Sequence, residues 1–354
     1  MKILHVISTL QMGGAEHLMV DLLPALRDLG NEVELLLING ERTPFYDELE
    51  RQRIKIHKIQ ERGRIYSPLH IFKARKYLHQ YDVIHTHTSP CQFLMAAAKK
   101  LSRSKVHLVT TEHSTNNHRR AKKWFKPVDK WMYRQYDVKI CISEKARTNL
   151  VTHIEEEKSV VTIHNGIDCG RFASPIKEAL PVVKNITMIA SMRDAKDQDT
   201  LIKAVHLLGK GYMLKLVGDG SRRTVLENLA NELNCGDCIE FCGNRDDIPQ
   251  LLKQSDIVVH SSHWEGFGLA AVEAMAAGRP LIASDIEGLH EVVHGAGILF
   301  PPGDYAALAN IIRDLCNNPK FYNLVAARCQ DRSKQFDISL MAEKYNQVYQ
   351  SLLK

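Results

Sequence analysis

Two glutamates separated by a glycine-rich turn and a run of small apolar residues could together hold a charged ligand. Glu265 and Glu273 lie in the stretch "SSHWEGFGLAAVEAMAAGRPLIASDIEGLHEVV", where a helix is expected to begin near Leu269. Gly266 and Gly268 would let backbone amides approach a ligand, and the free N–H groups at the start of the helix favour an anion. The stretch therefore predicts a diphosphate site at this turn.

The two carboxylates would lie on either side of that anion. Eight helical residues span about 12 Å, which is comparable to the distance from a sugar ring to a ribose across a diphosphate. Glu273 could then accept hydrogen bonds from ribose hydroxyls while Glu265 contacts the sugar. The alternative is that Glu273 is a solvated helix residue and Glu265 a cap, because glutamates at this separation are common by chance.

Two other motifs suggest metal binding, and each has a simpler explanation. The acidic "DQD" from Asp197 to Asp199 stands at an expected helix start, which favours an N-cap or first-turn role. Cys235, Cys238 and Cys242 in "NCGDCIEFC" are closely spaced but lack a fourth ligand and a second paired knuckle, so free thiols are favoured over zinc. We therefore expect no catalytic metal and no cofactor.

The stretch "HRRAKKWFKPVDKWMYRQY" combines basic residues with tryptophans, as interfacial membrane elements do. Its basic residues are Arg119, Arg120, Lys122, Lys123, Lys126 and Lys130, and its large apolar residues are Trp124, Phe125, Trp131 and Met132. Pro127 would divide it into two short helical pieces. Residues 119–134 could therefore contact an anionic membrane, or they could form a surface helix whose aromatic rings pack on the protein.

Composition and length indicate a soluble globular protein of two domains. The chain has 354 residues, with 44% hydrophobic and 25% charged residues, and single cores usually stop growing below about 300 residues. No apolar run approaches the roughly 20 residues of a membrane span, and the apolar start is too short for a signal peptide. Because no export signal is evident, the eight cysteines are expected to be reduced thiols, as in cytoplasmic proteins. The net charge of +6 is only mildly basic, so the protein need not have a nucleic-acid partner.

Short β-branched runs alternate with amphipathic helical patterns, which predicts βαβ units and parallel sheets. "KILHVIS", "NEVELLLI", "YDVIHTHT" and "YDVKICIS" belong to a first doubly wound lobe over residues 1–167. A second lobe is expected over residues 168–336. It opens with a connector that contains Pro175 and Pro181, and the alternating pattern restarts at "NITMIASM". Residues 337–354 form a helix that could return to the first lobe. We expect two Rossmann-like α/β lobes facing a central cleft, with ligands beyond the carboxyl ends of the strands.

The long glutamate-bearing string, followed by "GILFPPGD", resembles the signature of retaining glycosyltransferases of family 4, whose two-lobed fold is called GT-B. The resemblance covers nearly the whole chain. Further segments fall in the family's order, namely "GGAEHLMVDLLPAL", "TEHS", "DVKICISE", "IHNGID", "AKDQDTLIKA", "LVGDGSRRTVLE" and "FCGNRDDIPQLL". The first lobe is then expected on the acceptor side and the second to bind the donor.

The resemblance implies roles for individual residues of the second lobe. Glu265 would contact donor sugar hydroxyls and Glu273 the ribose, and Lys196 would neutralise the departing diphosphate. The family usually has an arginine five positions before that lysine. Ser191 occupies that position here, so Arg193 is the expected substitute.

Other positions follow from the same resemblance. Gly14 in "GGAE" would approach the phosphates from the first lobe, and His113 in "TEHS" would contact the reacting sugar. Arg245 would neighbour the nucleobase. The turn residues expected to bind the donor are Gly266, Phe267, Gly268 and Leu269.

The implied activity is metal-independent transfer of a hexosyl or N-acetylhexosaminyl group, with retention, from a UDP-sugar to a hydroxyl of a glycan or lipid-linked acceptor. Such an enzyme would serve cell-surface polysaccharide or glycolipid synthesis, in the cytoplasm or at the cytoplasmic membrane face. A nucleotide-sugar epimerase on the same fold and a non-catalytic nucleotide-sugar sensor stay as alternatives. A dehydrogenase is disfavoured because no G-x-G-x-x-G follows the first strand.

Overall fold

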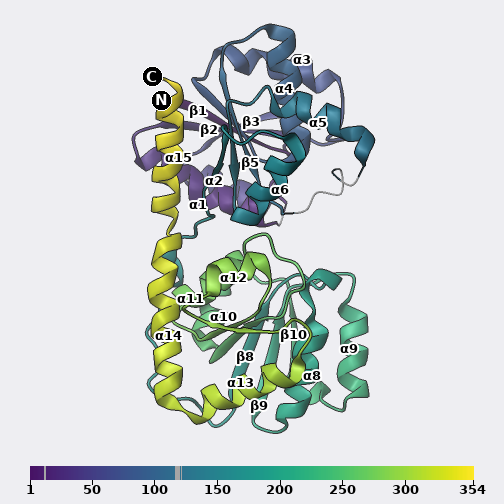
Figure 1. The fold of residues 1–354 in the computed structure, drawn as a ribbon, viewed down its shortest axis with the longest axis vertical. Coiled ribbons are helices and arrows are strands. Elements are labelled where there is room, and N and C mark those ends of the chain that lie inside the picture. Colours follow the sequence, from purple (N-terminus) through teal and green to yellow (C-terminus); the bar gives the residue numbers. More distant parts are fainter. Residues whose placement is uncertain (12, 116–119, 121) are drawn as a thin grey trace. The chain divides into compact units, whose positions relative to one another are not determined.

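The computed structural model describes residues 1–11, 13–115, 120 and 122–354. These form two compact units, each built around one parallel β-sheet (Figure 1). The first unit comprises Met1–Gly166 together with Ile338–Lys354, and the second comprises Ile167–Asp337. The C-terminal helix therefore packs with the N-terminal segment of the chain rather than with the segment that precedes it.

The first sheet has the strand order β3-β2-β1-β4-β5-β6-β7, and every pair is parallel. Its strands are β1 Lys2–Ile7, β2 Glu32–Asn39, β3 Lys55–Gln60, β4 Val83–Thr86, β5 His107–Glu112, β6 Val138–Cys141 and β7 Val160–Thr162. The first six follow the doubly wound 3-2-1-4-5-6 order. The order reverses at β1 and β4, so the loops after these strands diverge at the carboxyl edge.

Helices cover both faces of the first sheet, which explains why its strands are apolar on both sides. One face packs against α1 Gly14–Asp28, α2 Pro44–Arg51 and α15 Ile338–Leu352. The other packs against α3 Leu69–Ala74, η1 Arg75–His79, α4 Ser89–Ser102, α5 Lys126–Tyr133 and α6 Glu144–Ile154. The short η3, Lys123–Phe125, immediately precedes α5.

The second sheet repeats this topology, with the order β10-β9-β8-β11-β12-β13 and parallel pairing throughout. Its strands are β8 Lys184–Ile189, β9 Tyr212–Val217, β10 Ile239–Gly243, β11 Ile257–His260, β12 Leu281–Ser284 and β13 Ile298–Phe300. The predicted fold class of two Rossmann-like α/β lobes is confirmed.

The helices of the second unit alternate with its strands, as the βαβ rhythm requires. They are α7 Cys169–Phe172, η4 Asp194–Lys196, α8 Gln198–Leu208, α9 Arg223–Glu232, η5 Gly236–Cys238, α10 Ile248–Gln254, α11 Leu269–Ala276, α12 Glu287–Val293, α13 Tyr305–Asn317, α14 Pro319–Ser333 and η6 Lys334–Phe336. All eight cysteines of the chain are free thiols.

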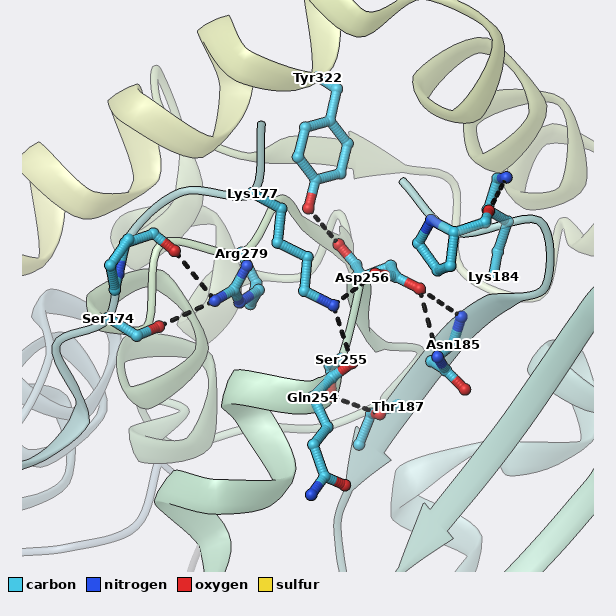
Figure 2. Close-up of polar contacts among 12 residues, drawn as sticks. Ser174, Lys177, Lys184, Asn185, Thr187, Gln254, Ser255, Asp256, Arg279 and Tyr322 are labelled. Atoms are coloured by element: carbon cyan, nitrogen blue, oxygen red, sulfur yellow. Dashed lines mark hydrogen bonds and ion pairs between the residues drawn. The ribbon is translucent and has the colours of Figure 1, made fainter. Parts of the chain in front are cut away.

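A buried carboxylate ties the amino ends of the central strands of this unit together (Figure 2). Asp256, immediately before β11, accepts hydrogen bonds from the backbone N–H of Asn185 in β8 at 2.7 Å and from Lys177 Nζ at 2.5 Å. The hydroxyl of Tyr322 in α14 donates to the backbone carbonyl of Asp256 at 2.8 Å. One aspartate thus joins two strands, a helix and the connector that enters the unit.

A buried arginine fixes the same connector at a second point. Arg279, just before β12, donates from Nη2 to Ser174 Oγ at 2.9 Å and to the carbonyl of Pro175 at 3.1 Å (Figure 2). These contacts lie at the amino edge of the sheet. The carboxyl edge, where ligands bind in open α/β sheets, is left to the loops that carry the predicted site.

Candidate functional site

The predicted residues of the second unit gather at one edge of its sheet. Arg193 and Lys196 follow β8, Arg245 follows β10, and residues 265–269 follow β11. Because all six strands are parallel, these loops leave the sheet at the same, carboxyl edge. β8 and β11 are also hydrogen-bonded neighbours, so the loops after them begin side by side.

The turn between β11 and α11 has a backbone shape that requires glycine. Gly268 is the N-cap of α11 and has φ +92°, a left-handed conformation that other residues adopt only with strain. A Cβ atom at this position would also lie 2.7 Å from Cδ2 of Leu289. The helix begins at Leu269 as predicted, so its first N–H groups lie where the loop ends.

Gly288, a second glycine that sequence reasoning did not single out, lets α12 pack closely against this loop. A Cβ atom at Gly288 in α12 would overlap the backbone carbonyl oxygen of Glu265. The helix can therefore approach the loop closely only because it has no side chain there. The residue belongs to the "EGLHEVV" end of the predicted string, where a glycine in the first turn of a short helix was the available signal.

The loop after β11 is hydrogen-bonded to the loop after β8. The backbone N–H of His263 donates to the carbonyl of Ala195 at 2.9 Å, and Ser261 Oγ donates to the carbonyl of Asp197 at 2.8 Å. These bonds hold the predicted cation and the predicted glycine turn in one rigid arrangement.

Within this arrangement Lys196 and Glu265 form an ion pair. Both side chains are mostly buried but reach the surface. Arg193, three residues before Lys196, is exposed, and its guanidinium makes no hydrogen bond or ion pair with any residue that the structure describes. The edge thus combines one paired cation, one available cation and one carboxylate, which can bind an anion beside a hydroxylated group.

The simple alternatives for the two glutamates are wrong. Glu273 is only 6% exposed, so it is not a solvated helix residue. Glu265 is not the cap of α11, because Gly268 occupies that position. A buried carboxylate inside a mostly apolar helix needs polar partners, and Glu273 does have such interactions. The ribose and sugar roles of the two residues stay predictions.

The "DQD" motif has the structural role that its position predicted. Asp197 is the N-cap of α8 and accepts hydrogen bonds from the backbone N–H and the hydroxyl of Thr200, at 3.4 and 2.7 Å. Asp199 forms an ion pair with Arg222 Nη2 at 2.7 Å. Each carboxylate therefore already has a partner within the protein.

Two predicted donor residues have side chains that are engaged elsewhere. Arg245 forms two hydrogen bonds with the carboxylate of Asp247, at 2.7 and 2.6 Å. The ring of Phe267 is buried and packs edge-on against Phe336, with ring centroids 5.4 Å apart. A donor contact from Phe267 would have to come from its backbone.

His260, the last residue of β11, is a site neighbour that sequence reasoning missed. Its side chain is buried. Burial lowers the pKa of this histidine to about 4, although the negative charge of Glu265 opposes the shift. The imidazole is therefore neutral at pH 7. The signal in the sequence was a histidine at the carboxyl end of the apolar run "DIVVHSS".

The two predicted residues of the first unit also follow strands at its carboxyl edge. Gly14 is the first residue of α1, after β1, and it is exposed. His113 directly follows β5, and its Nε2 lies 3.0 Å from Nδ1 of His87. Burial lowers the pKa of His113 to about 4, against the opposing effect of Glu112, so the ring is neutral.

The basic and aromatic stretch is divided between buried and exposed side chains. Residues 119 and 121 lie outside the described residues. Arg120 is mostly buried and forms an ion pair with Glu112 at 2.7 Å, and Met132 is part of the core. Trp124 and Trp131 are 70% and 38% exposed, so the tryptophans do not pack fully on the unit.

The lysines of the same stretch are partly neutralised. Lys126 and Lys130 both contact the carboxylate of Glu155, at 2.8 and 2.5 Å. Across the described parts of the chain, the helices are all too short or too polar to cross a membrane.

Comparison with known proteins gives two family matches that together span most of the chain. The family described as "Glycosyl transferases group 1" matches residues 175–334, and "Glycosyltransferase Family 4" matches residues 12–171. The chain is 26% identical over 300 residues to the Escherichia coli UDP-Gal:alpha-D-GlcNAc-diphosphoundecaprenol alpha-1,3-galactosyltransferase, covering 76% of this chain and 75% of that protein. It is also 26% identical over 377 residues to the GDP-mannose:cellobiosyl-diphosphopolyprenol alpha-mannosyltransferase of Komagataeibacter xylinus, covering 100% and 94%.

The fold is similar to that of solved structures over the full length. Anabaena HepE, crystallised with UDP and glucose, superimposes with a TM-score of 0.87 at 24% identity, covering 99% of this chain and 100% of HepE.

Proposed function

This chain belongs to the group 1 glycosyltransferases, and from that premise we propose that it is a retaining enzyme that transfers a hexosyl or N-acetylhexosaminyl group from a UDP-sugar to a hydroxyl group of a glycan or lipid-linked acceptor. Both relatives are named for a nucleotide-sugar donor and a diphospholipid-linked acceptor, although one of them uses GDP-mannose. One is named for transfer from UDP-Gal to a diphosphoundecaprenol-linked sugar, and HepE was crystallised with UDP and glucose. Cell-surface polysaccharide or glycolipid synthesis is the corresponding process.

The observation that carries the proposal is the meeting of Lys196, Glu265 and the start of α11 at one edge of the second sheet. A diphosphate at the helix start would accept hydrogen bonds from the first N–H groups of α11. Lys196 and the available guanidinium of Arg193 would neutralise its negative charge as the glycosidic bond breaks. These cations supply the charge that a divalent metal would otherwise supply, so we propose a metal-independent reaction.

The carboxylates would select the two ends of the donor. Glu265 would accept hydrogen bonds from hydroxyls of the sugar, and the buried Glu273 would accept them from the ribose. Carboxylates at both ends of the site favour a ligand that carries hydroxyl groups at both ends, because charged acceptors form the stronger hydrogen bonds. The phosphates would lie between them, along the Gly266–Gly268 turn.

The reaction would proceed with departure and attack on one face of the sugar. The bond between the anomeric carbon and the diphosphate oxygen breaks, and a bond to the acceptor oxygen forms. The acceptor proton passes to the departing phosphate oxygen, so no covalent intermediate with the protein is needed. His113, a neutral imidazole, would hold the sugar by hydrogen bonding and would not act as a base.

A panel of nucleotide sugars tests this proposal. We expect one UDP-sugar to be hydrolysed slowly, and to be transferred to a suitable acceptor with the anomeric configuration retained. In parallel, UDP affinity is measured by calorimetry for wild type, Glu273→Ala, Glu273→Gln and the exposed control Glu232→Ala. Loss of a charge-assisted hydrogen bond should weaken UDP binding by about 10- to 100-fold in the Glu273 variants alone.

The same panel separates the alternatives. An epimerase would release an altered nucleotide sugar without any acceptor, and a sensor would bind the donor without turnover. Undiminished UDP affinity in Glu273→Ala, with folding intact, would remove the ribose assignment. An inverted product anomer would remove the retaining mechanism.

We also propose that the enzyme associates peripherally with the cytoplasmic face of a membrane through residues 119–134. The exposed Trp124 and Trp131 support this, since amphipathic rings flanked by lysines favour the headgroup region. A lipid-linked acceptor would then be presented where the first unit can reach it.

A further inference from the structure

Four histidines lie on one face of the first sheet, on three adjacent strands or directly after them. His5 is in β1, His85 is in β4 and is its register partner, and His87 follows β4. His113 follows β5, the next strand. His5, His85 and His87 are buried. Histidines two residues apart in a strand share a face, so the sheet itself brings these rings together.

Three of the four rings form a continuous hydrogen-bonded chain. His5 Nδ1 lies 2.8 Å from His87 Nε2, and His87 Nδ1 lies 3.0 Å from His113 Nε2. Burial lowers the pKa of His5 to about 3 and that of His87 well below its ordinary value. Each ring is therefore neutral and carries one N–H, and the two bonds must run in the same direction.

The buried end of the chain decides that direction. Within the described part of the protein, His5 Nε2 is buried and has no hydrogen-bond partner. If the bonds ran from His113 to His5, this atom would carry a buried N–H without an acceptor, which folded proteins rarely contain. If the bonds run from His5 to His113, His5 Nε2 carries no proton and has only an unused lone pair. The second arrangement is favoured, and it places the proton of His113 on Nδ1.

We propose that His87, oriented by His5, is a positioning residue that donates to Nε2 of His113 and so fixes both its tautomer and its ring orientation. His113 then offers Nδ1–H as a hydrogen-bond donor to an oxygen of the donor sugar. The sugar contact rests on the proposed function, whereas the tautomer of His113 does not depend on it.

The fourth histidine belongs to a separate set of hydrogen bonds. His85 Nδ1 lies 2.6 Å from the hydroxyl of Tyr349, and His85 Nε2 lies 2.8 Å from Thr111 Oγ1. Thr111 Oγ1 is in turn 2.9 Å from the hydroxyl of Tyr345. Both tyrosines are on α15, so the C-terminal helix closes this face of the sheet. His85 stacks on His87, with ring centroids 4.4 Å apart, and limits its rotation.

These bonds weigh against a metal ion in the same place. Nitrogen atoms of His5, His85 and His87 lie within 4.8 Å of one another. However, both nitrogens of His85 and of His87 are already hydrogen-bonded, and no carboxylate belongs to the group to balance the charge of a buried cation.

Nitrogen NMR of the full-length protein with ¹⁵N-labelled histidine tests the proposal, with His113 assigned from the spectrum of His113→Gln. We expect wild type to show His113 protonated at Nδ1 and unprotonated at Nε2. His87→Leu should lose this preference, and His87→Asn should restore it, because the amide nitrogen of asparagine can replace Nδ1 as donor. His70→Leu, which removes a buried histidine from another part of the same unit, is the matched control and should leave the His113 tautomer unchanged.

Activity gives the second measurement. Misplacing a contact group costs up to about 100-fold in rate, so His87→Leu should lower kcat/KM for the sugar donor by about 10- to 100-fold while UDP affinity is unchanged. His113 protonated at Nε2 in wild type, or unchanged in His87→Leu, would overturn the proposal. So would stoichiometric Zn²⁺ uptake that shifts the His5, His85 and His87 resonances. An enzyme without transferase activity but with the expected tautomer would instead contradict the proposed function alone.

Discussion

Lys196 and Glu265, 69 positions apart in the sequence, form an ion pair at the carboxyl edge of the second sheet. The pair joins the predicted phosphate-binding cation to the predicted sugar-binding carboxylate. Because each charge is mostly buried, removing one leaves the other without its partner. The two residues therefore act as one unit, and single substitutions of either are expected to mix catalytic and structural effects.

The first prediction separates those effects. Lys196→Ala should lower kcat by about 100- to 1000-fold, because it removes a cation that stabilises charge on the departing diphosphate. Glu265→Gln should weaken binding of the UDP-sugar and leave UDP affinity nearly unchanged. Donor hydrolysis and calorimetry with UDP and with UDP-sugar measure both. The exposed lysine variant Lys210→Ala is the control, and equal losses in it would show a general charge effect.

The second prediction concerns the turn into α11. Gly268→Ala should weaken UDP binding at least tenfold, because the left-handed backbone is strained and the new Cβ would press on Leu289. Gly303→Ala is a matched control: Gly303 has φ +81°, and a Cβ there would meet no atom within 4 Å. It carries the backbone strain without the contact. If both variants bind UDP equally well, the geometry of the turn does not govern donor binding.

Much of the fold was predictable because parallel strands buried on both faces appear as short, nearly continuous apolar runs. The glycine turn and the start of α11 were predictable because their residue types dictate local backbone shape. The Lys196–Glu265 pair was not, since it depends on β8 and β11 being neighbours in the sheet. The close packing of Gly288 against the loop was not predictable either, because it depends on which backbone atoms lie beside that glycine in the folded protein.

The histidine chain shows the same limit. His5 and His87 are 82 positions apart, and His87 and His113 are 26 apart. His113 was singled out by the resemblance, whereas His5 and His87 look in sequence like isolated histidines of apolar strands, and only the strand order β1-β4-β5 aligns the three. The burial of Glu273 was equally hidden, because a glutamate in an alanine-rich helix suits either a solvated or a buried face.

The third prediction tests the network that ties the connector to the second sheet. Lys177→Met leaves the buried carboxylate of Asp256 without its cation and should cost about 3 kcal/mol of unfolding free energy. Adding Asp256→Asn should recover part of that loss, because the amide keeps an acceptor for the Asn185 N–H and carries no charge. Denaturant unfolding of both single variants and the double variant measures the coupling. Additive losses would mean that the ion pair contributes nothing.

The fourth prediction is a loss of stability at mildly acidic pH. The folded pKa of His5 is about 3, and those of His85 and His87 lie well below their ordinary values, whereas unfolded histidines have pKa values near 6.5. Below pH 6.5 the unfolded state binds more protons, so stability falls as pH falls. Over the whole interval from pH 7.5 to 5.5, which spans the unfolded pKa, each histidine contributes about 1.4 kcal/mol, or about 4 kcal/mol for the three.

Urea unfolding at a series of pH values measures this slope. His5→Leu should reduce the slope by about one proton, because one buried neutral histidine is gone. His79 is exposed and serves as the control, so His79→Ala should leave the slope unchanged. A slope that is the same in His5→Leu and wild type would contradict the assignment of acid sensitivity to the buried histidines.

The last prediction concerns membrane binding by residues 119–134. Trp124→Ala and Trp131→Ala should each weaken binding to vesicles of phosphatidylcholine with phosphatidylglycerol by about tenfold, because an exposed indole loses its place at the headgroups. Trp264→Ala removes a tryptophan of the second unit that is about as exposed as Trp124, and it should have no effect. Glu155→Gln should strengthen binding, because Glu155 neutralises Lys126 and Lys130 and its pKa is lowered to about 2 by their hydrogen bonds. Cosedimentation at low and high salt measures all four variants. Only the Glu155→Gln gain should vanish in high salt, since it is electrostatic, and a salt-independent gain would place the effect in folding rather than in contact with the lipid.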